Sequence, residues 1–212
     1  MKYAALISKL KAMSAKAATD KNGSGRAGLQ PNNFKPLSRK AATKLCRYIP
    51  CKRQRDYVMA ATQDTSLNHY IAQWKRLNRL DKPNRIALKS TLGAEIDLNN
   101  ILWMYRLKRY HRVTGNATFG HLIPIRYMLS REATRRMADC TTPKALLDEI
   151  ASSPYAADFI HLAEKENNTR IGQPTPEEML AKAITRRYQT AARRYPNTLA
   201  PVLAYLAQFR EQ

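Results

Sequence analysis

Three cysteines and four histidines are the side chains in this sequence best suited to metal binding or nucleophilic catalysis. Cys46 and Cys51 lie five positions apart, and no second Cys pair or His-x-His pair follows at the spacing of a zinc site. The histidines are isolated from one another on different predicted helices: His69, His111, His121 and His161. We therefore expect no metal site, and we interpret Cys46, Cys51 and Cys140 as solvated or buried thiols.

The local signatures of common catalytic sites are also missing from the sequence. It contains no nucleophile elbow and no HExxH motif. Gly23-Ser24-Gly25 has neither a preceding strand pattern nor the Lys-Ser/Thr ending of a phosphate-binding loop. Glu177 and Glu178 directly follow Thr175-Pro176, where helix capping and the helix dipole account for paired acids. The sequence predicts a protein that is not an enzyme and needs no cofactor.

The charge of the chain is its most extreme bulk property. The 212 residues carry a formal net charge of +21. Residues 1–60 alone hold 14 Lys and Arg against two Asp, a balance of +12. The electric field of so many positive charges favours acidic partners, which include a nucleic acid, an anionic membrane surface and an acidic protein face.

The apolar segments are too short for membrane insertion. The longest candidate, residues 198–209, is far below the roughly 18–20 residues that span a bilayer. Lys9 and Lys11 interrupt the N-terminal segment, so no secretory signal is evident. With three cysteines and no even framework, we expect a reducing, cytoplasmic location.

Helical periodicity predicts an all-α fold without a sheet. We expect an N-terminal helix in residues 1–19, a basic linker containing Gly and Pro in residues 20–60, and a helical body in residues 61–212. Within the body, one helix should cover residues 67–79 and another should run from Asp81-Lys82-Pro83 to Leu92, ending at Gly93. Further starts are predicted at Ser130, Thr142-Pro143, Ser153-Pro154 and Thr175-Pro176, and a final helix at residues 199–210.

The segment LGAEIDLNNILWMYRLKRYHRV (Leu92–Val113) places an apolar cluster directly before a basic one. A helix that is apolar on nearly all sides must be enclosed by other helices. We expect Glu95 and Asp97 to complement the dipole at its N-terminus, the alternatives being an acidic contact or a buried ion pair. The basic residues at its end should emerge into water. The predicted core residues are Ile101, Leu102, Trp103, Tyr105 and Leu203.

This segment, together with HLIPIRYMLS (residues 121–130), resembles the C subunit of archaeal and bacterial A/V-type rotary ATPases, called subunit d in eukaryotes. Two further stretches are similar to the same family. MKYAALISKLKAM (residues 1–13) resembles its opening helix, and YPNTLAPVLAYL (residues 195–206) resembles a segment near its end. The resemblance implies a funnel-like fold of repeated helical lobes.

The resemblance also implies a function. In that family the subunit is a non-catalytic adaptor that couples the central stalk to the membrane rotor ring during ion transport. Its implied partners are the ring and stalk subunits and an anionic membrane surface, and it is peripheral on the cytoplasmic face. For this chain we expect partner-binding charges at Arg106, Lys108, Arg109 and Arg112.

Two departures from the family leave other functions open. Residues 17–60 do not resemble the family's first lobe, and the chain ends soon after Leu206, so we expect a shortened or divergent member. A basic nucleic-acid-binding protein is one alternative, because Arg186-Arg187-Tyr188 recurs seven residues later as Arg193-Arg194-Tyr195. An inactive remnant is another. On general grounds the repeat fits amphipathic packing with arginines at its edge better than a nucleic-acid surface.

Overall fold

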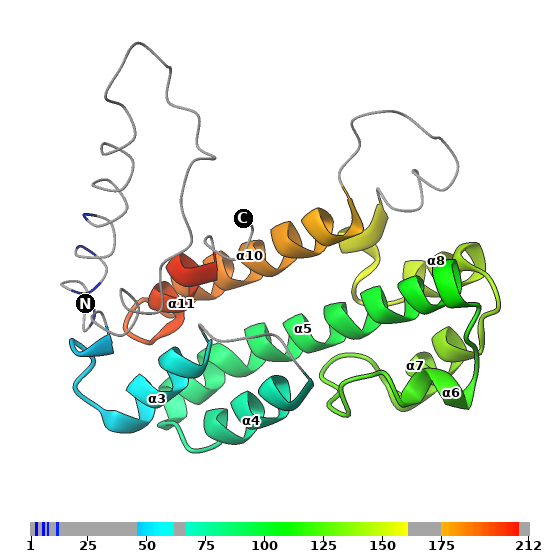
Figure 1. Ribbon diagram of the computed structural model, residues 1–212. Helices are drawn as coiled ribbons and strands as arrows, with labels where there is room; N and C mark the ends of the chain where they lie inside the picture. Colours follow the sequence, from blue (N-terminus) through cyan, green and yellow to red (C-terminus); the bar gives the residue numbers. More distant parts are fainter. Residues whose placement is uncertain are drawn as a thin grey trace, which may run out of the picture. The chain divides into compact units, whose positions relative to one another are not determined.

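The computed structural model describes residues 3, 6, 8, 12, 46–61, 67–160 and 175–207, and every regular element in them is helical (Figure 1). The all-α prediction is confirmed. The elements are α3 (Lys52–Ala61), α4 (Leu67–Leu77), α5 (Lys82–Arg106), η1 (Leu107–His111), α6 (Asn116–Phe119), α7 (Arg131–Asp139), α8 (Pro143–Ala151), α10 (Pro176–Arg194) and α11 (Ala200–Ala207). Within this part of the chain, no helix combines the length and apolar character needed to cross a bilayer.

The chain forms two compact units. Unit 1 comprises Met1–Thr65, Ala72–Leu88 and Thr185–Gln212, and unit 2 comprises Ser66–Ile71 and Lys89–Ile184. The expected boundary between residues 19 and 20 lies outside the described residues. Residues 52–60, which we expected in a linker, form most of α3. This helix was missed because its strongly basic composition hides the residues that it buries, which include Gln54, Tyr57 and Val58.

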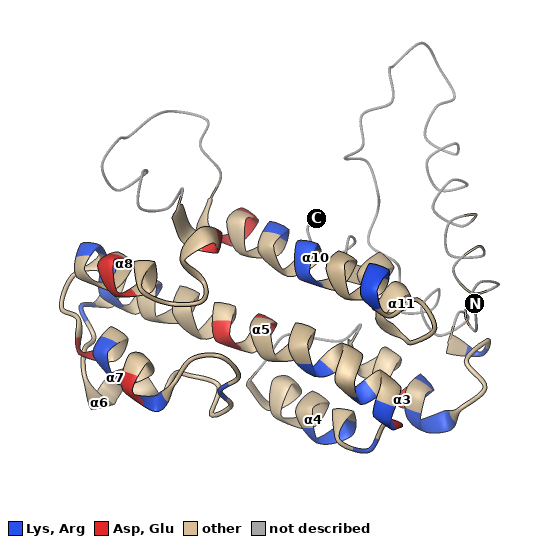
Figure 2. Ribbon diagram, turned by 180° about the vertical axis from the view of Figure 1, so that it is seen from behind, with Lys and Arg blue, Asp and Glu red and all other residues tan. Residues whose placement is uncertain are grey.

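A series of side-chain hydrogen bonds joins segments of unit 1 that are distant in sequence. Gln54 accepts a bond from the hydroxyl of Tyr3 over 2.8 Å and donates one to Oδ1 of Asp81, also over 2.8 Å. Asn84 donates to the same carboxylate and accepts from the backbone N–H of Leu199 over 2.7 Å. Leu203, a predicted core residue, is buried on α11. Figure 2 marks in blue the basic residues of unit 1 along the ribbon of α3 and at the end of α4.

Unit 2 packs around the C-terminal part of α5, with α6, α7 and α8 beside it (Figures 1 and 2). Ile101, Leu102 and Tyr105 belong to its buried apolar cluster, together with side chains that include Leu146, Ile150, Phe159 and Ala183. Such a cluster excludes water from the helix interfaces, which stabilises the unit.

The predicted break at Gly93 is wrong, because α5 is continuous from Lys82 to Arg106. Gly93 instead allows the side chain of Tyr127 to pack closely against α5, since an added Cβ at position 93 would lie 2.7 Å from Cβ of Tyr127. Asp97 is therefore in mid-helix rather than at a helix start. Its carboxyl group is fully buried and accepts bonds from the backbone N–H groups of Tyr127, Met128 and Leu129 and from the hydroxyl of Tyr155.

Glu95 also differs from the expectation of an N-terminal helix charge. It is buried within α5 and accepts a hydrogen bond from the hydroxyl of Tyr70 over 3.1 Å. Asn99 donates to the same hydroxyl over 3.1 Å. Both acids thus fix neighbouring segments of unit 2 on α5.

Capping signals were predicted more accurately. Ser130 accepts a hydrogen bond from the N–H of Ala133, and Thr142 accepts one from Ala145. Thr175 and Glu178 exchange bonds in both directions, over 2.9 and 3.2 Å, as a capping box requires. The helix that follows, α10, ends at Arg194.

Candidate partner-binding site

The candidate site is centred on η1, where the backbone changes from α-helix to a π-helical turn. Such turns are uncommon and are frequent at functional sites. The turn ends at Arg112, whose φ of 53° is in the left-handed region and whose N–H bonds to the carbonyl of Leu107. Left-handed backbone costs a residue with a side chain roughly 1–2 kcal/mol, so the surrounding structure must hold Arg112 in place.

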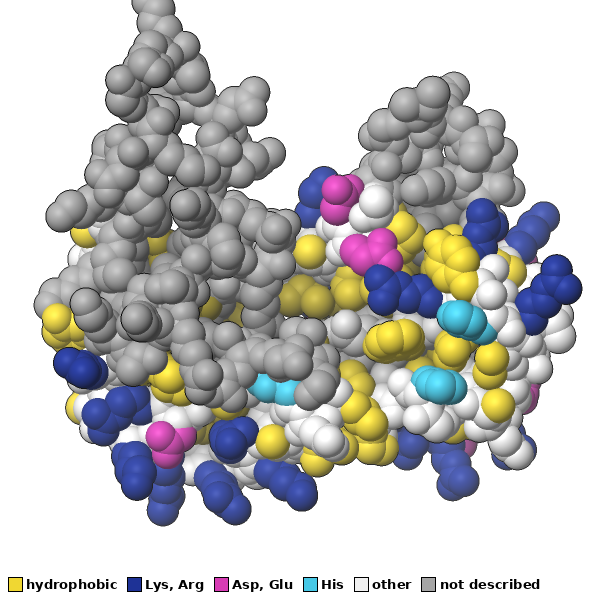
Figure 3. All heavy atoms as spheres, viewed as in Figure 1, with side chains coloured by type: hydrophobic (Ala, Val, Ile, Leu, Met, Phe, Trp, Pro, Cys, Tyr) yellow, Lys and Arg dark blue, Asp and Glu magenta, His cyan; other side chains and the backbone are white. Residues whose placement is uncertain are grey.

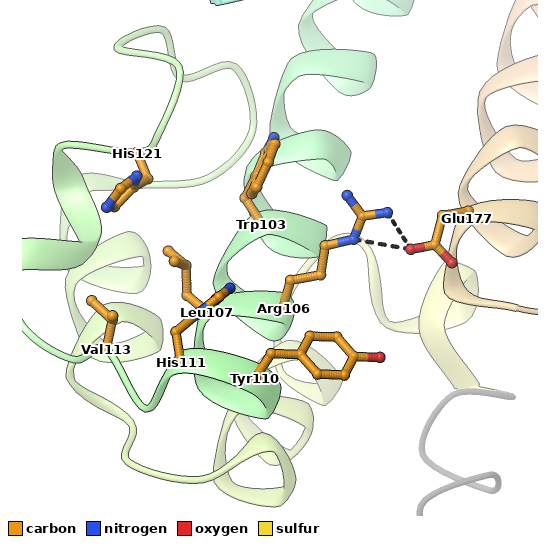
Figure 4. A pocket seen from close by; sticks show the side chains of 8 residues that line it. All are labelled: Trp103, Arg106, Leu107, Tyr110, His111, Val113, His121 and Glu177. Atoms are coloured by element: carbon orange, nitrogen blue, oxygen red, sulfur yellow. Dashed lines mark hydrogen bonds and ion pairs between the residues drawn. The ribbon is translucent and has the colours of Figure 1, made fainter.

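One side of η1 forms a pocket of about 560 Å³, which we call the aromatic pocket. Its lining is Trp103, Arg106, Leu107, Tyr110, His111, Val113, His121 and Glu177 (Figure 4). Trp103 is 44% exposed and Tyr110 is 71% exposed. Figure 3 shows hydrophobic and histidine side chains exposed side by side on this face. Exposed aromatic side chains of this size are typical of contact surfaces.

An ion pair closes one edge of the aromatic pocket. Nε of Arg106 donates to Oε1 of Glu177 over 2.9 Å, and its Nη2 contacts the same oxygen (Figure 4). The guanidinium carbon also lies 5.5 Å from the ring centre of Trp103. Burial raises the pKa of Glu177, but hydrogen bonds, chiefly from Arg106, outweigh it and hold that pKa below its usual range. Arg106 is therefore engaged within the protein rather than freely exposed.

Two histidines complete the aromatic pocket. His111 comes from the end of η1, and His121 from the loop after α6, facing Trp103 across the pocket (Figure 4). Both are exposed. Within the described residues, no group of three or more His, Cys, Asp or Glu is placed to hold a metal ion.

The other side of η1 forms a second pocket of about 530 Å³, which we call the cationic pocket. Its lining is Lys108, Arg109, Arg112, Thr114, Thr141, Thr142 and Pro143. Arg109 and Arg112 are exposed, as the sequence predicted. The turn η1 thus separates an aromatic surface from a basic one.

Two predicted positions are wrong. Trp103, expected in the core, is exposed, because five consecutive apolar residues cannot all face the interior of a helix. Lys108, expected at the surface, is 2% exposed, and its Nζ donates to the carbonyl of Ala138 over 2.9 Å. Lys108 follows the buried residues Ile101, Met104 and Tyr105 by seven, four and three positions, so helical spacing places it on the buried face despite its charge.

Sequence reasoning did not single out Tyr110, Val113 or His121 as site residues. Glu177 was interpreted only as a capping acid, although its contact with Arg106 spans 71 positions. A short-range pattern contains no signal for such a contact.

The comparison with known proteins decides the family. The model of the ATP synthase (C/AC39) subunit family matches residues 62–211, more than two thirds of the chain. The chain belongs to this family. No curated protein and no solved structure matches it. As a member of the C/AC39 family, the chain is a subunit of a rotary ATPase of the A/V type, and the resemblance noted in Leu92–Val113 is confirmed.

Within this C/AC39 chain, both pockets lie in the segment matched by the family model. So do α4, α5 and all later described elements. The stretch at residues 1–13 that also resembles the family lies outside the match.

Proposed function

We propose that this chain is a non-catalytic adaptor that couples the central stalk of an A/V-type rotary ATPase to the membrane rotor ring. Family membership over residues 62–211 is the observation that carries the proposal. The chain would act as a peripheral protein on the cytoplasmic face of the membrane. Its task is mechanical, since torque from ATP hydrolysis must pass between two partners.

The buried network of Asp97 supports a mechanical role. One carboxyl group joins α5 to the backbone at residues 127–129 and to the hydroxyl of Tyr155. A buried acceptor with several short hydrogen bonds cannot shift without losing them, and each loss costs about 1–3 kcal/mol. Unit 2 therefore resists deformation at its centre, as torque transfer requires.

The aromatic pocket is the proposed contact with another subunit of the complex. Trp103 and Tyr110 offer large apolar surfaces, and Arg106 and Glu177 provide polar groups at the edge. Buried aromatic anchors surrounded by polar groups carry much of the energy of protein interfaces. Arg109, exposed on the opposite side of η1, adds positive charge for an acidic partner or anionic headgroups.

Affinity purification from native membranes tests the proposal. We expect the tagged chain to recover rotor-ring and central-stalk subunits. The double variant Trp103→Ala, Tyr110→Ala should recover less of them, by tenfold or more if two anchors of about 1–2 kcal/mol each are lost. Phe119→Ala is the matched control, because Phe119 is 39% exposed in the same unit but does not line the aromatic pocket.

If the chain instead binds nucleic acid, the same affinity purification should give a different result. A chain that acts on DNA or RNA should elute with nucleic acid and lose it steeply as salt rises, because each neutralised phosphate releases counterions. Recovery of nucleic acid without any ATPase subunit would overturn the adaptor proposal.

A further inference from the structure

We propose that the cationic pocket is a binding site for a phosphate-type oxyanion. The pocket is lined by three basic residues, Lys108, Arg109 and Arg112, and by residues at the N-terminus of α8. Thr114, Thr141 and Thr142 also line it. Three basic residues and one helix N-terminus thus border one cavity of about 530 Å³.

Lys108 is the residue that points to a ligand. It is 2% exposed, and among the described residues its Nζ has one hydrogen bond, to the carbonyl of Ala138. No carboxylate of the described residues is within ion-pair distance of it. An ammonium group has three N–H donors, so two remain available. A buried charge without a counter-charge is costly, and an anion in the cationic pocket would supply that counter-charge.

The electrostatics of Lys108 agree with this interpretation. Burial lowers the pKa of Lys108 below its ordinary value, and the nearby Cys140 and Asp139 only partly offset the effect. Asp139 is exposed, so water weakens its interaction with the ammonium. The pocket therefore retains excess positive charge.

The position of Arg112 adds a second cation. Its backbone is left-handed at the end of η1, and its exposed guanidinium has no ion pair or side-chain hydrogen bond within the described part of the chain. Arginine presents a fork of N–H donors that matches two oxygens of a phosphate group. Arg112 is thus available to bind an anion in the cationic pocket that Lys108 also lines.

The start of α8 contributes a third favourable element. The side chain of Thr142 caps this helix by accepting from the N–H of Ala145 over 3.2 Å, and Pro143 occupies the first position. The helix dipole places partial positive charge at this end, where anions are stabilised. A phosphate group carries more charge and more acceptor oxygens than a carboxylate, so it matches this set of donors better.

The site is independent of the adaptor role and can be measured on the isolated chain. Thermal unfolding should be compared in phosphate and in chloride at equal ionic strength. We expect phosphate to raise Tm specifically, since a ligand that binds the native state stabilises it. Arg112→Asn and Lys108→Met should abolish the difference or weaken phosphate binding about tenfold or more, the loss expected for a charge-assisted hydrogen bond.

The variants are chosen so that folding and binding can be separated. Asparagine tolerates left-handed backbone, and Arg112 is exposed, so Arg112→Asn should fold even if Lys108→Met does not. Arg135→Gln is the matched control, because it removes one exposed charge from α7 outside the pocket. An equal effect of phosphate and chloride, or an equal loss in Arg135→Gln and Arg112→Asn, would overturn the proposal.

Vesicle flotation distinguishes the two sources of the phosphate group. Flotation with vesicles of phosphatidylcholine plus phosphatidic acid, lost in Arg112→Asn but kept in Arg135→Gln, identifies a lipid headgroup. A phosphate-dependent rise in Tm without flotation identifies a free phosphate compound. Both results support the oxyanion site, and neither depends on recovery of other ATPase subunits.

Discussion

The hydroxyl of Tyr155 donates a hydrogen bond to Oδ2 of Asp97 over 2.8 Å, joining positions 58 residues apart in the centre of unit 2. The same carboxyl group accepts three backbone N–H bonds from residues 127–129. All of these donors are satisfied by one fully buried side chain. This arrangement makes Asp97 the position of α5 whose loss should affect the fold most.

Asp97→Ala should lower the free energy of unfolding by about 3 kcal/mol or more, because it leaves buried donors unsatisfied. Tyr155→Phe removes one bond only and should cost about 2 kcal/mol. Urea unfolding measures both values. The exposed acid Asp148 on α8 provides the control, since Asp148→Ala should change stability by less than about 0.5 kcal/mol. Equal stabilities for Asp97→Ala and this control would contradict the assignment.

Gly93→Ala should destabilise the chain by about 1–3 kcal/mol, because the new Cβ would overlap the side chain of Tyr127. The same change in a Tyr127→Gly background should instead stabilise it by about 0.5–1 kcal/mol, since the overlapping atoms, which include Cβ of Tyr127, are then absent and alanine favours a helix interior. Thermal or urea unfolding of the four proteins measures the reversal. If Gly93→Ala has the same effect in both backgrounds, close approach of Tyr127 is not the reason for the glycine.

The Arg106–Glu177 pair should contribute less than about 1 kcal/mol, because side-chain exposures of 34% and 49% allow water to screen it. The pKa of Glu177 is lowered in the folded chain, so this stabilisation is present above the unfolded pKa of about 4.3 and is lost as pH falls through the folded value. A double-mutant cycle with Arg106→Gln and Glu177→Gln, measured at neutral and acidic pH, checks this. A coupling energy that persists at the acidic end would contradict it.

The cysteines should differ in reactivity. Burial raises the pKa of Cys46 to about 11, although Arg55 partly opposes the effect, so its thiolate is scarce at neutral pH. Cys51 is exposed. A thiol-specific disulfide reagent should therefore modify Cys51 rapidly and Cys46 only after unfolding. Cys51→Ser should remove the fast phase, and rapid labelling that survives this change and Cys140→Ser would show that Cys46 is accessible.

The starts of several helices could be predicted from the sequence, because a helix start depends on residues that are close together in the chain. Ser130, Thr142 and Thr175 each bond to a backbone N–H three residues ahead, a pattern that is visible in the sequence. The all-α class followed from periodicity in the same way. Family membership could be predicted from the segment Leu92–Val113, because its amino-acid sequence is distinctive enough to resemble that family.

The errors involve contacts between distant segments or a charged side chain on a buried helix face. Gly93 resembles a residue at a helix end. It lies in the middle of α5 instead, because the side chain of Tyr127 leaves no room there for a Cβ. Asp97 resembles a cap, yet its donors come from residues 127–129 and from Tyr155. Lys108 was expected in water because of its charge, although it follows Met104 by four positions and Ile101 by seven, which places it on the buried face of the helix.

The proposed coupling role can be measured directly as ATP-driven ion uptake into membrane vesicles from cells that lack this chain. Adding back the purified chain should restore uptake, because the stalk and ring would again be connected. The Trp103→Ala, Tyr110→Ala variant should restore less uptake, and Phe119→Ala should restore it fully. Ion uptake that is already normal in the depleted vesicles, or that the added chain leaves unchanged, would contradict the proposed function.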